Sequence, residues 1–162
     1  RRYTADEYRK IVENLRKVSE DVSVTTDVMV GFPGETDEEF NETYQFVEDV
    51  AFSKIHVFQY SPREGTPAAR FKAQVPSQIK AARSDKLIEL GTRLEQEFMD
   101  KFIGTEEKVL FEQLIPGSSN IYEGYTENYI KVAAESSHDI QNEIISVVLE
   151  RMEDDILLGK IR

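Results

Sequence analysis

Two loops rich in glycine and proline hold the residue types that could do chemistry. The first has the sequence G-F-P-G-E-T over residues 31–36, where glycines let the backbone approach a ligand closely. The amides that open the helix after it could hold an anion or a carboxylate. The second loop covers residues 61–70, where Arg63 and Arg70 could contact phosphates. The simpler interpretations are a tight turn between a strand and a helix for the first loop, and a solvated loop tip for the second.

Ionisable residues outside these loops offer less. Asp27 lies within an otherwise apolar strand, where a carboxylate needs partners, so we expect it to make structural hydrogen bonds. His56 shares a strand face with Phe58 and Tyr60, and we expect a core histidine with satisfied hydrogen bonds rather than a catalytic one. The sequence contains no cysteine. This excludes disulfides, thiolate nucleophiles, cysteine-zinc sites and cysteine-ligated iron–sulfur clusters from this chain.

Local patterns predict the elements that position both loops. The T-x-x-E pattern of a capping box occurs at residues 4–7 and again at residues 36–39, each before a helical spacing of apolar residues. Runs rich in β-branched residues predict buried strands at 22–30 and 52–60. This α-β-α-β order indicates parallel strands with helices outside, and each loop then follows the carboxyl end of a strand. A start on a helix is odd for such a fold, so we expect the chain to be cut from a longer protein.

A long helix and a group of short strands follow. Helical spacing of apolar residues extends from Pro76 to Phe102, and Gly104 suits the position after a helix. Short β-rich runs, separated by turn residues, then occupy residues 108–114, 121–125, 129–134, 143–150 and 156–161. These runs predict a small closed barrel of five antiparallel strands, because closure removes exposed edges. We therefore expect two domains, residues 1–103 and 104–162.

The charge of the chain is acidic and unevenly distributed. Its 20 basic and 31 acidic residues give a formal net charge of −11. Residues 104–162 contain 5 basic and 12 acidic side chains, whereas residues 63–86 contain 6 basic and 2 acidic ones. Overall charge therefore argues against a basic nucleic-acid module, with one basic window as the exception. The sequence has no run of 18 apolar residues, and its first residues lack the pattern of a signal peptide, so we expect a cytoplasmic protein without a membrane partner.

Several segments resemble one enzyme family. T-T-D-V-M-V-G-F-P-G-E-T at residues 25–36 resembles the fifth strand and following loop of radical-SAM methylthiotransferases. F-S-K-I-H-V-F-Q-Y-S-P-R-E-G-T-P-A-A at residues 52–69 resembles their sixth strand and loop. The opening R-R-Y-T with Tyr8 is similar to the segment after their fourth strand, and the final 59 residues are similar to their TRAM domain. The sequence most resembles the threonylcarbamoyladenosine tRNA branch, and the isopentenyladenosine tRNA and ribosomal-protein S12 branches share the same frame.

The resemblance implies a fold and a set of cofactors. The fold would be an α/β fragment of the radical-SAM (TIM-like) barrel followed by the small TRAM β-barrel. The full-length enzyme would use S-adenosylmethionine and two [4Fe–4S] clusters, and without cysteines this fragment is expected to bind none of them and to be inactive alone. By resemblance, Gly31, Phe32, Gly34 and Glu35 would line the S-adenosylmethionine site. Phe58 and Tyr60 would approach the adenine. No catalytic residue carries over.

The resemblance also implies partners. One partner is the anticodon arm of a tRNA, because such enzymes add a methylthio group to a modified adenosine next to the anticodon. The other is the missing N-terminal part of the same chain. Tyr122, Tyr125 and Tyr129 cluster in a hairpin of the second domain and could stack on bases. The cations of the basic window could contact phosphates; these are Arg63, Arg70 and Lys72, with Lys80, Arg83 and Lys86 beyond them.

Two other functions fit the same residues. One is a free-standing RNA-binding or adaptor protein that uses the barrel and the basic window. The other is a small enzyme for phosphate-containing ligands that shares TIM-barrel ancestry and works without a metal. With part of its barrel missing, the sheet would leave an edge and an apolar face open, so we expect self-association or low stability.

Overall fold

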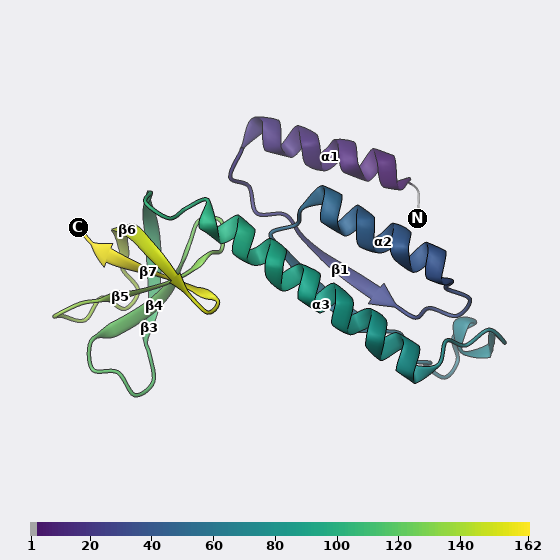
Figure 1. Cartoon of the computed structure of the whole chain (residues 1–162). Helices are drawn as coiled ribbons and strands as arrows, with labels where there is room; N and C mark the ends of the chain where they lie inside the picture. The colour runs from purple at the N-terminus through teal and green to yellow at the C-terminus, as the bar shows by residue number, and fades with distance from the viewer. Residues whose placement is uncertain (1–2) are drawn as a thin grey trace. The chain divides into compact units, whose positions relative to one another are not determined.

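The computed structural model describes residues 3–162, which fold into two compact units (Figure 1). The first unit extends to Glu95 and the second covers Gln96–Arg162. The division falls within the longest helix, α3 (Ser77–Asp100), so this helix contributes to both units. The domain limits expected from the sequence, 1–103 and 104–162, stay a prediction.

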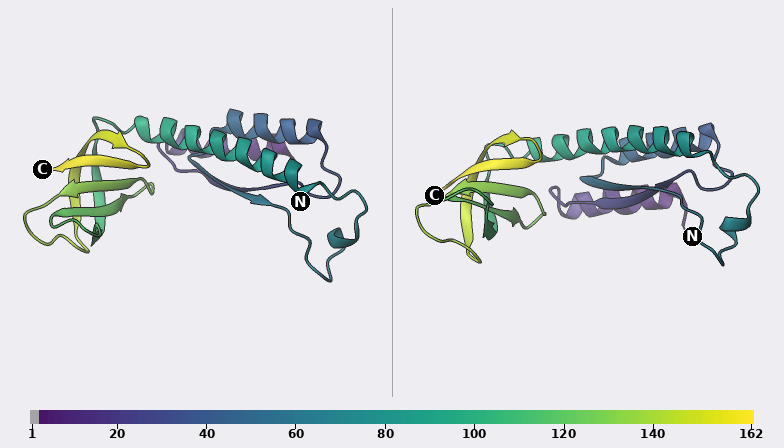
Figure 2. Two further views of the ribbon diagram at one scale, coloured as in Figure 1. Left: turned by 60° about the horizontal axis from the view of Figure 1, so that its bottom comes forward. Right: turned by 90° about the horizontal axis from the view of Figure 1, so that it is seen from below.

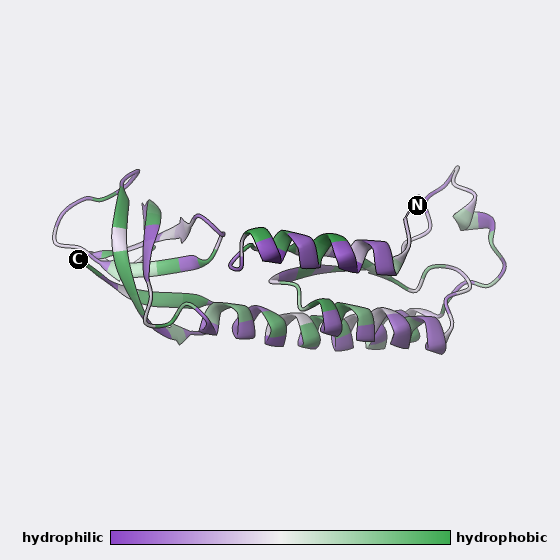
Figure 3. Cartoon of the chain, turned by 90° about the horizontal axis from the view of Figure 1, so that it is seen from above, coloured by the Kyte–Doolittle hydropathy of each residue, from purple (hydrophilic) through white to green (hydrophobic). Residues whose placement is uncertain are grey.

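Both predicted capping boxes are present. Helix α1 (Ala5–Val18) begins after Thr4, whose hydroxyl accepts the Glu7 amide while the Glu7 carboxylate accepts the Thr4 amide. Helix α2 (Asp37–Val50) begins in the same way after Thr36, with Glu39 as the reciprocal partner. Each box satisfies two amides that a helix start otherwise leaves unpaired. The polar and apolar bands that alternate along the helices can be followed in Figure 3.

Strands β1 (Thr25–Val30) and β2 (Lys54–Gln59) form a parallel two-stranded sheet. Helices α2 and α3 cover one of its faces, and Figure 2 shows both on the same side of the strands. Gly91 of α3 lies against Ile55 so closely that a Cβ atom would collide with that side chain. The core of this unit lies between helices and sheet; its buried members are Val12, Val28, Val30, Phe40, Val47, Val50, Phe52, Leu87, Leu90 and Leu94.

The other face of the sheet is exposed within the part of the chain that the structure describes. Three register pairs alternate with the buried positions along the strands, namely Thr25 with Lys54, Asp27 with His56 and Met29 with Phe58. The expectation of an apolar open face is therefore wrong, because two of these three pairs are polar. A connection of residues 60–76 follows β2 and contains the short 3₁₀ helix η1 (Ala68–Arg70).

The second unit is a closed barrel of five strands in the order β3-β4-β5-β7-β6. Its strands are β3 (Glu106–Leu114), β4 (Ile121–Thr126), β5 (Lys131–Glu135), β6 (Ile144–Glu153) and β7 (Ile156–Ile161). The barrel is not fully antiparallel as predicted, because β5 and β7 pair in parallel. Strand directions cannot alternate all the way around a closed ring with an odd number of strands, so at least one pair must be parallel.

The barrel core is apolar and includes the end of α3. Met99 of α3 and Phe102, just after this helix, are buried with residues of the strands and loops, which are Val109, Phe111, Tyr122, Ile130, Val132, Ala134, Ile140, Val147, Leu149 and Leu157. The Gly104 amide donates to the Leu149 carbonyl, which fixes the exit of the helix at the barrel wall. Over residues 3–162, no helix is both long enough and apolar enough to span a membrane.

Candidate functional site

The loop after β1 turns on Gly31 and is held from within. Gly31 has a backbone φ of +72°, which favours glycine, and the stem of Lys80 fills the space where a Cβ would stand. Its amide donates to both carboxylate oxygens of Glu35, each at 3.0 Å. The Gly34 amide donates to the Ala73 carbonyl at 2.7 Å. A carboxylate of the chain itself, Glu35, therefore occupies the amide at the start of this turn, and binding of an anion by the amides that open α2 stays a prediction.

Arg83 of α3 binds the same carboxylate from the other side. Its Nη1 lies 2.5 Å from Glu35 Oε1, and its Nη2 lies 2.7 Å from Asp37 Oδ1. The guanidinium also lies over the Phe40 ring, 5.4 Å from its centroid, and the residue is only 6% exposed. Burial lowers the pKa of Arg83, but hydrogen bonds and charges from Asp37 and Glu35 outweigh it, so the pKa is above its ordinary value. Arg83 thus holds the loop through Glu35 and is not the phosphate-binding cation that the basic window suggested.

An aromatic cluster closes the end of β2. The Tyr60 ring is buried and lies edge-on to Phe32, with 5.3 Å between ring centroids, and Phe32 also meets Phe71 at 6.3 Å. The Tyr60 amide donates to the Val30 carbonyl, and its own carbonyl accepts Lys80 Nζ at 2.8 Å. The predicted residues Phe32 and Tyr60 are therefore in contact, and the half-buried Lys80 contacts the strand ends.

The open sheet face carries three sequence candidates. Phe58 is 53% exposed beside Met29, and its approach to an adenine ring stays a prediction. His56 is exposed and not a core histidine, and Asp27 is exposed beside it, so both expectations of a buried structural role are wrong. Strand alternation is the reason: these residues occupy the face opposite the helices, and polar side chains are tolerated there.

The basic loop presents three exposed cations. Arg63, Arg70 and Lys72 are all exposed in the connection between β2 and α3. The backbone beneath them is ordered by local hydrogen bonds: the Thr66 hydroxyl donates to the Arg63 carbonyl, and the Gln74 amide group donates to two carbonyls of the 3₁₀ turn. The cations are therefore available to a polyanion on a loop with defined backbone contacts.

The three barrel tyrosines differ in exposure to solvent. Tyr122 is buried in the barrel core, where burial raises the pKa of its hydroxyl and Asp139 raises it further, so it cannot stack on a base. Tyr125 lies on the outer face opposite Lys131 in register, and Tyr129 is 83% exposed in the turn before β5. Tyr129 also has a left-handed backbone, with a φ of +62°, which is unfavourable for a bulky residue.

A charged pair lies beside Tyr125. Lys131 Nζ is 2.8 Å from Glu123 Oε2, and the Gln113 amide group also donates to the Glu123 carboxylate. The Lys131 hydrogen bond is the main cause that lowers the pKa of Glu123, and Glu123 in turn raises the pKa of Lys131. This face of the barrel therefore combines an exposed ring with a neutralised charge pair.

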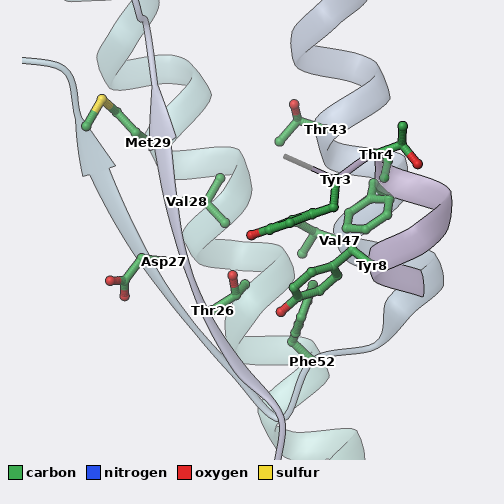
Figure 4. A pocket seen from close by; sticks show the side chains of 12 residues that line it. Tyr3, Thr4, Tyr8, Thr26, Asp27, Val28, Met29, Thr43, Val47 and Phe52 are labelled. Carbon is green, nitrogen blue, oxygen red and sulfur yellow. The ribbon is translucent and has the colours of Figure 1, made fainter. Parts of the chain in front are cut away.

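A cavity of about 400 Å³ lies between α1, β1 and α2 (Figure 4). Tyr3, Tyr8 and Phe52 contribute rings to it, and Thr26 and Val28 line it from β1. Asp27 and Met29 point to the opposite side of the strand in the same view. The cavity was not anticipated from the sequence. It adjoins the edge of β1 that has no strand partner among the described residues.

The helical position of Arg83 indicates that its side chain faces the core, which the count of charges in the basic window did not take into account. Positions 83, 87, 90 and 94 share one helical stripe, and the last three are leucines of the core. A cation in line with such a stripe is directed toward the core, and it needs anionic partners where it is buried. Arg1 and Arg2, the first residues of the R-R-Y-T segment, lie outside the described residues.

Comparison with known proteins identifies the family. Residues 1–47 match the model of the Radical SAM superfamily. The chain is 39% identical, over 91% of its length, to the threonylcarbamoyladenosine tRNA methylthiotransferase MtaB of Bacillus subtilis, of which it covers 33%. The chain belongs to the radical-SAM methylthiotransferase family. It is also 34% identical, over 99% of its length, to the tRNA-2-methylthio-N(6)-dimethylallyladenosine synthase of Acetivibrio thermocellus, covering 34% of that protein.

The methylthiotransferase relatives are longer than the chain. MtaB of Thermotoga maritima is 41% identical over 81% of the chain, and the match covers 30% of that protein. The chain therefore spans about a third of the length of the curated relatives it matches.

Proposed function

We propose that the chain is the part of a tRNA methylthiotransferase that contacts S-adenosylmethionine and the tRNA, within the branch that modifies threonylcarbamoyladenosine. The observation that carries this is the identity to MtaB of Bacillus subtilis over nine tenths of the chain. The two-stranded sheet corresponds in this proposal to part of a TIM-like barrel, and the five-stranded barrel to the TRAM domain. The isopentenyladenosine branch is the second candidate, favoured by the match over 99% of the chain to a dimethylallyladenosine synthase.

The iron–sulfur clusters of the family do not fit this chain. Such clusters are held by cysteine thiolates, and the sequence contains no cysteine. Over residues 3–162, no group of three or more His, Asp or Glu side chains could hold a metal ion. In this proposal the cluster ligands come from sequence outside this chain.

S-adenosylmethionine fits the residues at the strand ends in part. Phe58 and Met29 offer exposed apolar surface on the open face, and Phe32 is half-exposed at the loop, as an adenine ring requires. Gly34 has open space where a Cβ would stand, so a ligand can approach the backbone there. Glu35 and the Gly31 amide are used internally, so their role is to shape the loop. S-adenosylmethionine supplies the radical chemistry of the family, and this chain would bind and orient it.

The RNA contacts are assigned to two surfaces. Arg63, Arg70 and Lys72 supply exposed cations for phosphates. In five-stranded barrels of the OB type, the second and third strands form the face that binds oligonucleotides, and here these are β4 and β5. Tyr125 on β4 and Tyr129 in the turn that joins the two strands supply rings for stacking.

A pair of chimeras tests the function and the branch together. In one, the chain replaces the matching third of Bacillus subtilis MtaB; in the other, it replaces the matching third of the Bacillus velezensis dimethylallyladenosine synthase, to which it is 34% identical over 99% of its length. Each chimera is expressed in cells that lack the corresponding enzyme, and tRNA nucleosides are measured by mass spectrometry.

The expected result is methylthiolated threonylcarbamoyladenosine from the MtaB chimera and no product from the other. A product from the second chimera alone would move the chain to the isopentenyladenosine branch. Two soluble, cluster-loaded chimeras without any product would contradict the proposed function. A matched control uses the reciprocal third of each parent enzyme, which shows whether the junctions themselves permit activity.

A further inference from the structure

Two cations one turn apart on α3 contact the carboxyl ends of both strands. Lys80 donates to the carbonyl of Tyr60, the first residue after β2, and its stem packs on Gly31, the first residue after β1. Arg83 binds Glu35, whose carboxylate accepts the Gly31 amide. Residues three apart on a helix lie on one face, so a single turn of α3 reaches both strand ends.

The surroundings of Arg83 make its contacts specific. The residue is 6% exposed and lies 46 and 48 positions from its two carboxylate partners in the sequence. A buried guanidinium needs anionic partners, and its planar fork reaches Glu35 and Asp37 at once, which an ammonium cannot do. Nη1 also donates to the Glu35 carbonyl at 3.2 Å, so both ends of that residue are fixed.

We propose that Lys80 and Arg83 form a clamp that sets the position of the loop at residues 31–35, and that they are positioning residues for the ligand bound there. Arg83 acts through Glu35 on the Gly31 amide, and Lys80 acts on the Tyr60 carbonyl. The consequence for a ligand rests on the function proposed above. The contacts of the clamp itself do not, because they are internal to the chain.

Amide hydrogen exchange and carbonyl chemical shifts measured by NMR on this chain test the clamp. In Arg83→Gln, exchange of the Gly31 amide should accelerate about 10- to 100-fold, the effect of losing a charge-assisted hydrogen bond. Arg83→Lys should give only partial rescue, because it keeps the charge but loses the fork. In Lys80→Met, which keeps the stem, the carbonyl carbon of Tyr60 should shift while Gly31 exchange stays near wild type.

The matched control is Lys86→Met, an exposed cation on the same helix. It should change neither signal, and amides of the barrel should keep their exchange rates in all variants. If Arg83→Gln folds poorly, Glu35→Gln tests the same link between Arg83 and the Gly31 amide. Its effect on Gly31 should match that of Arg83→Gln, and the two effects should not add in the double variant.

The clamp is wrong if Gly31 exchange in Arg83→Gln stays within about twofold of wild type, or if the Arg83 and Glu35 effects add. Titration with S-adenosylmethionine gives the ligand readout. The amide signals of Phe32 and Gly34 should shift in wild type and in Lys86→Met, with affinity at least about fivefold weaker in Arg83→Gln. Absence of any shift in wild type would count against the proposed ligand, and the exchange data would still decide the clamp.

Discussion

Tyr122, whose side chain is largely buried in the barrel core, is the residue through which we expect alkaline pH to weaken the barrel. Its pKa is raised above the ordinary value, first by burial and then by Asp139, so the folded state binds this proton more tightly than the unfolded state. A raised pKa contributes stability that is complete below the unfolded value of about 10 and is lost as pH rises through the folded value.

We therefore predict that wild type loses stability above about pH 10 more steeply than Tyr122→Phe does. Urea unfolding of both proteins between about pH 8 and 11 measures the difference, because this range spans the ordinary tyrosine pKa of about 10. Asp139→Asn should flatten the profile partly, because it removes one of the causes. Parallel profiles for wild type and Tyr122→Phe would contradict this account of the barrel core.

At the scale of elements, the contact between α3 and the sheet depends on Gly91. A Cβ at this position would collide with the Ile55 side chain of β2, which packs against the core of the first unit. Helices approach a sheet this closely only where a small residue faces it, and overpacking forces side chains off their rotamers.

Gly91→Ala should therefore destabilise the first unit by about 1–3 kcal/mol, despite the better helix propensity of alanine. Combining it with Ile55→Val removes a methyl group at the contact and should recover part of the loss. Thermal unfolding followed by circular dichroism measures both variants. If Gly91→Ala proves more stable than wild type, helix propensity outweighs packing and the contact is looser than described.

At the scale of the whole molecule, the net charge of −11 sets a limit on RNA binding. Long-range repulsion opposes a polyanion, so attraction must come from local features such as the basic loop. We expect this chain to bind unmodified tRNA weakly, with a dissociation constant on the order of tens of micromolar or poorer. Each phosphate contact should add roughly 0.7–0.9 to the slope of log affinity against log salt concentration.

Reversing the loop charge should weaken this binding and flatten its salt dependence. The variant is Arg63→Glu with Arg70→Glu, titrated with tRNA at two salt concentrations. Lys10→Glu with Lys17→Glu, both exposed on α1, changes the net charge equally and should affect binding less. Equal affinities and slopes for the two double variants would mean that the basic loop is merely solvated, leaving the tyrosine face of the barrel as the RNA contact.

The sequence by itself determined the elements, because their signals are local. Both capping boxes, the helix and strand periods and the five barrel strands depend on residues a few positions apart, and all are found close to where those patterns predict them. The two loop motifs also identified the family, since they are long and occur in the right order. Strand number alone implied the parallel pair of the barrel, although the antiparallel expectation overlooked it.

Only the tertiary structure decided which side chains meet ligands and which are buried. The sequence suggested Arg83 and Lys80 as phosphate contacts. In the structure, partners up to 48 positions away hold both side chains in the clamp. Tyr122 and Tyr125 are three residues apart on one strand, and one faces the core while the other faces out. His56 is exposed because helices cover just one face of its sheet. Burial depends on contacts between distant segments, and no local pattern of residue types contains that information.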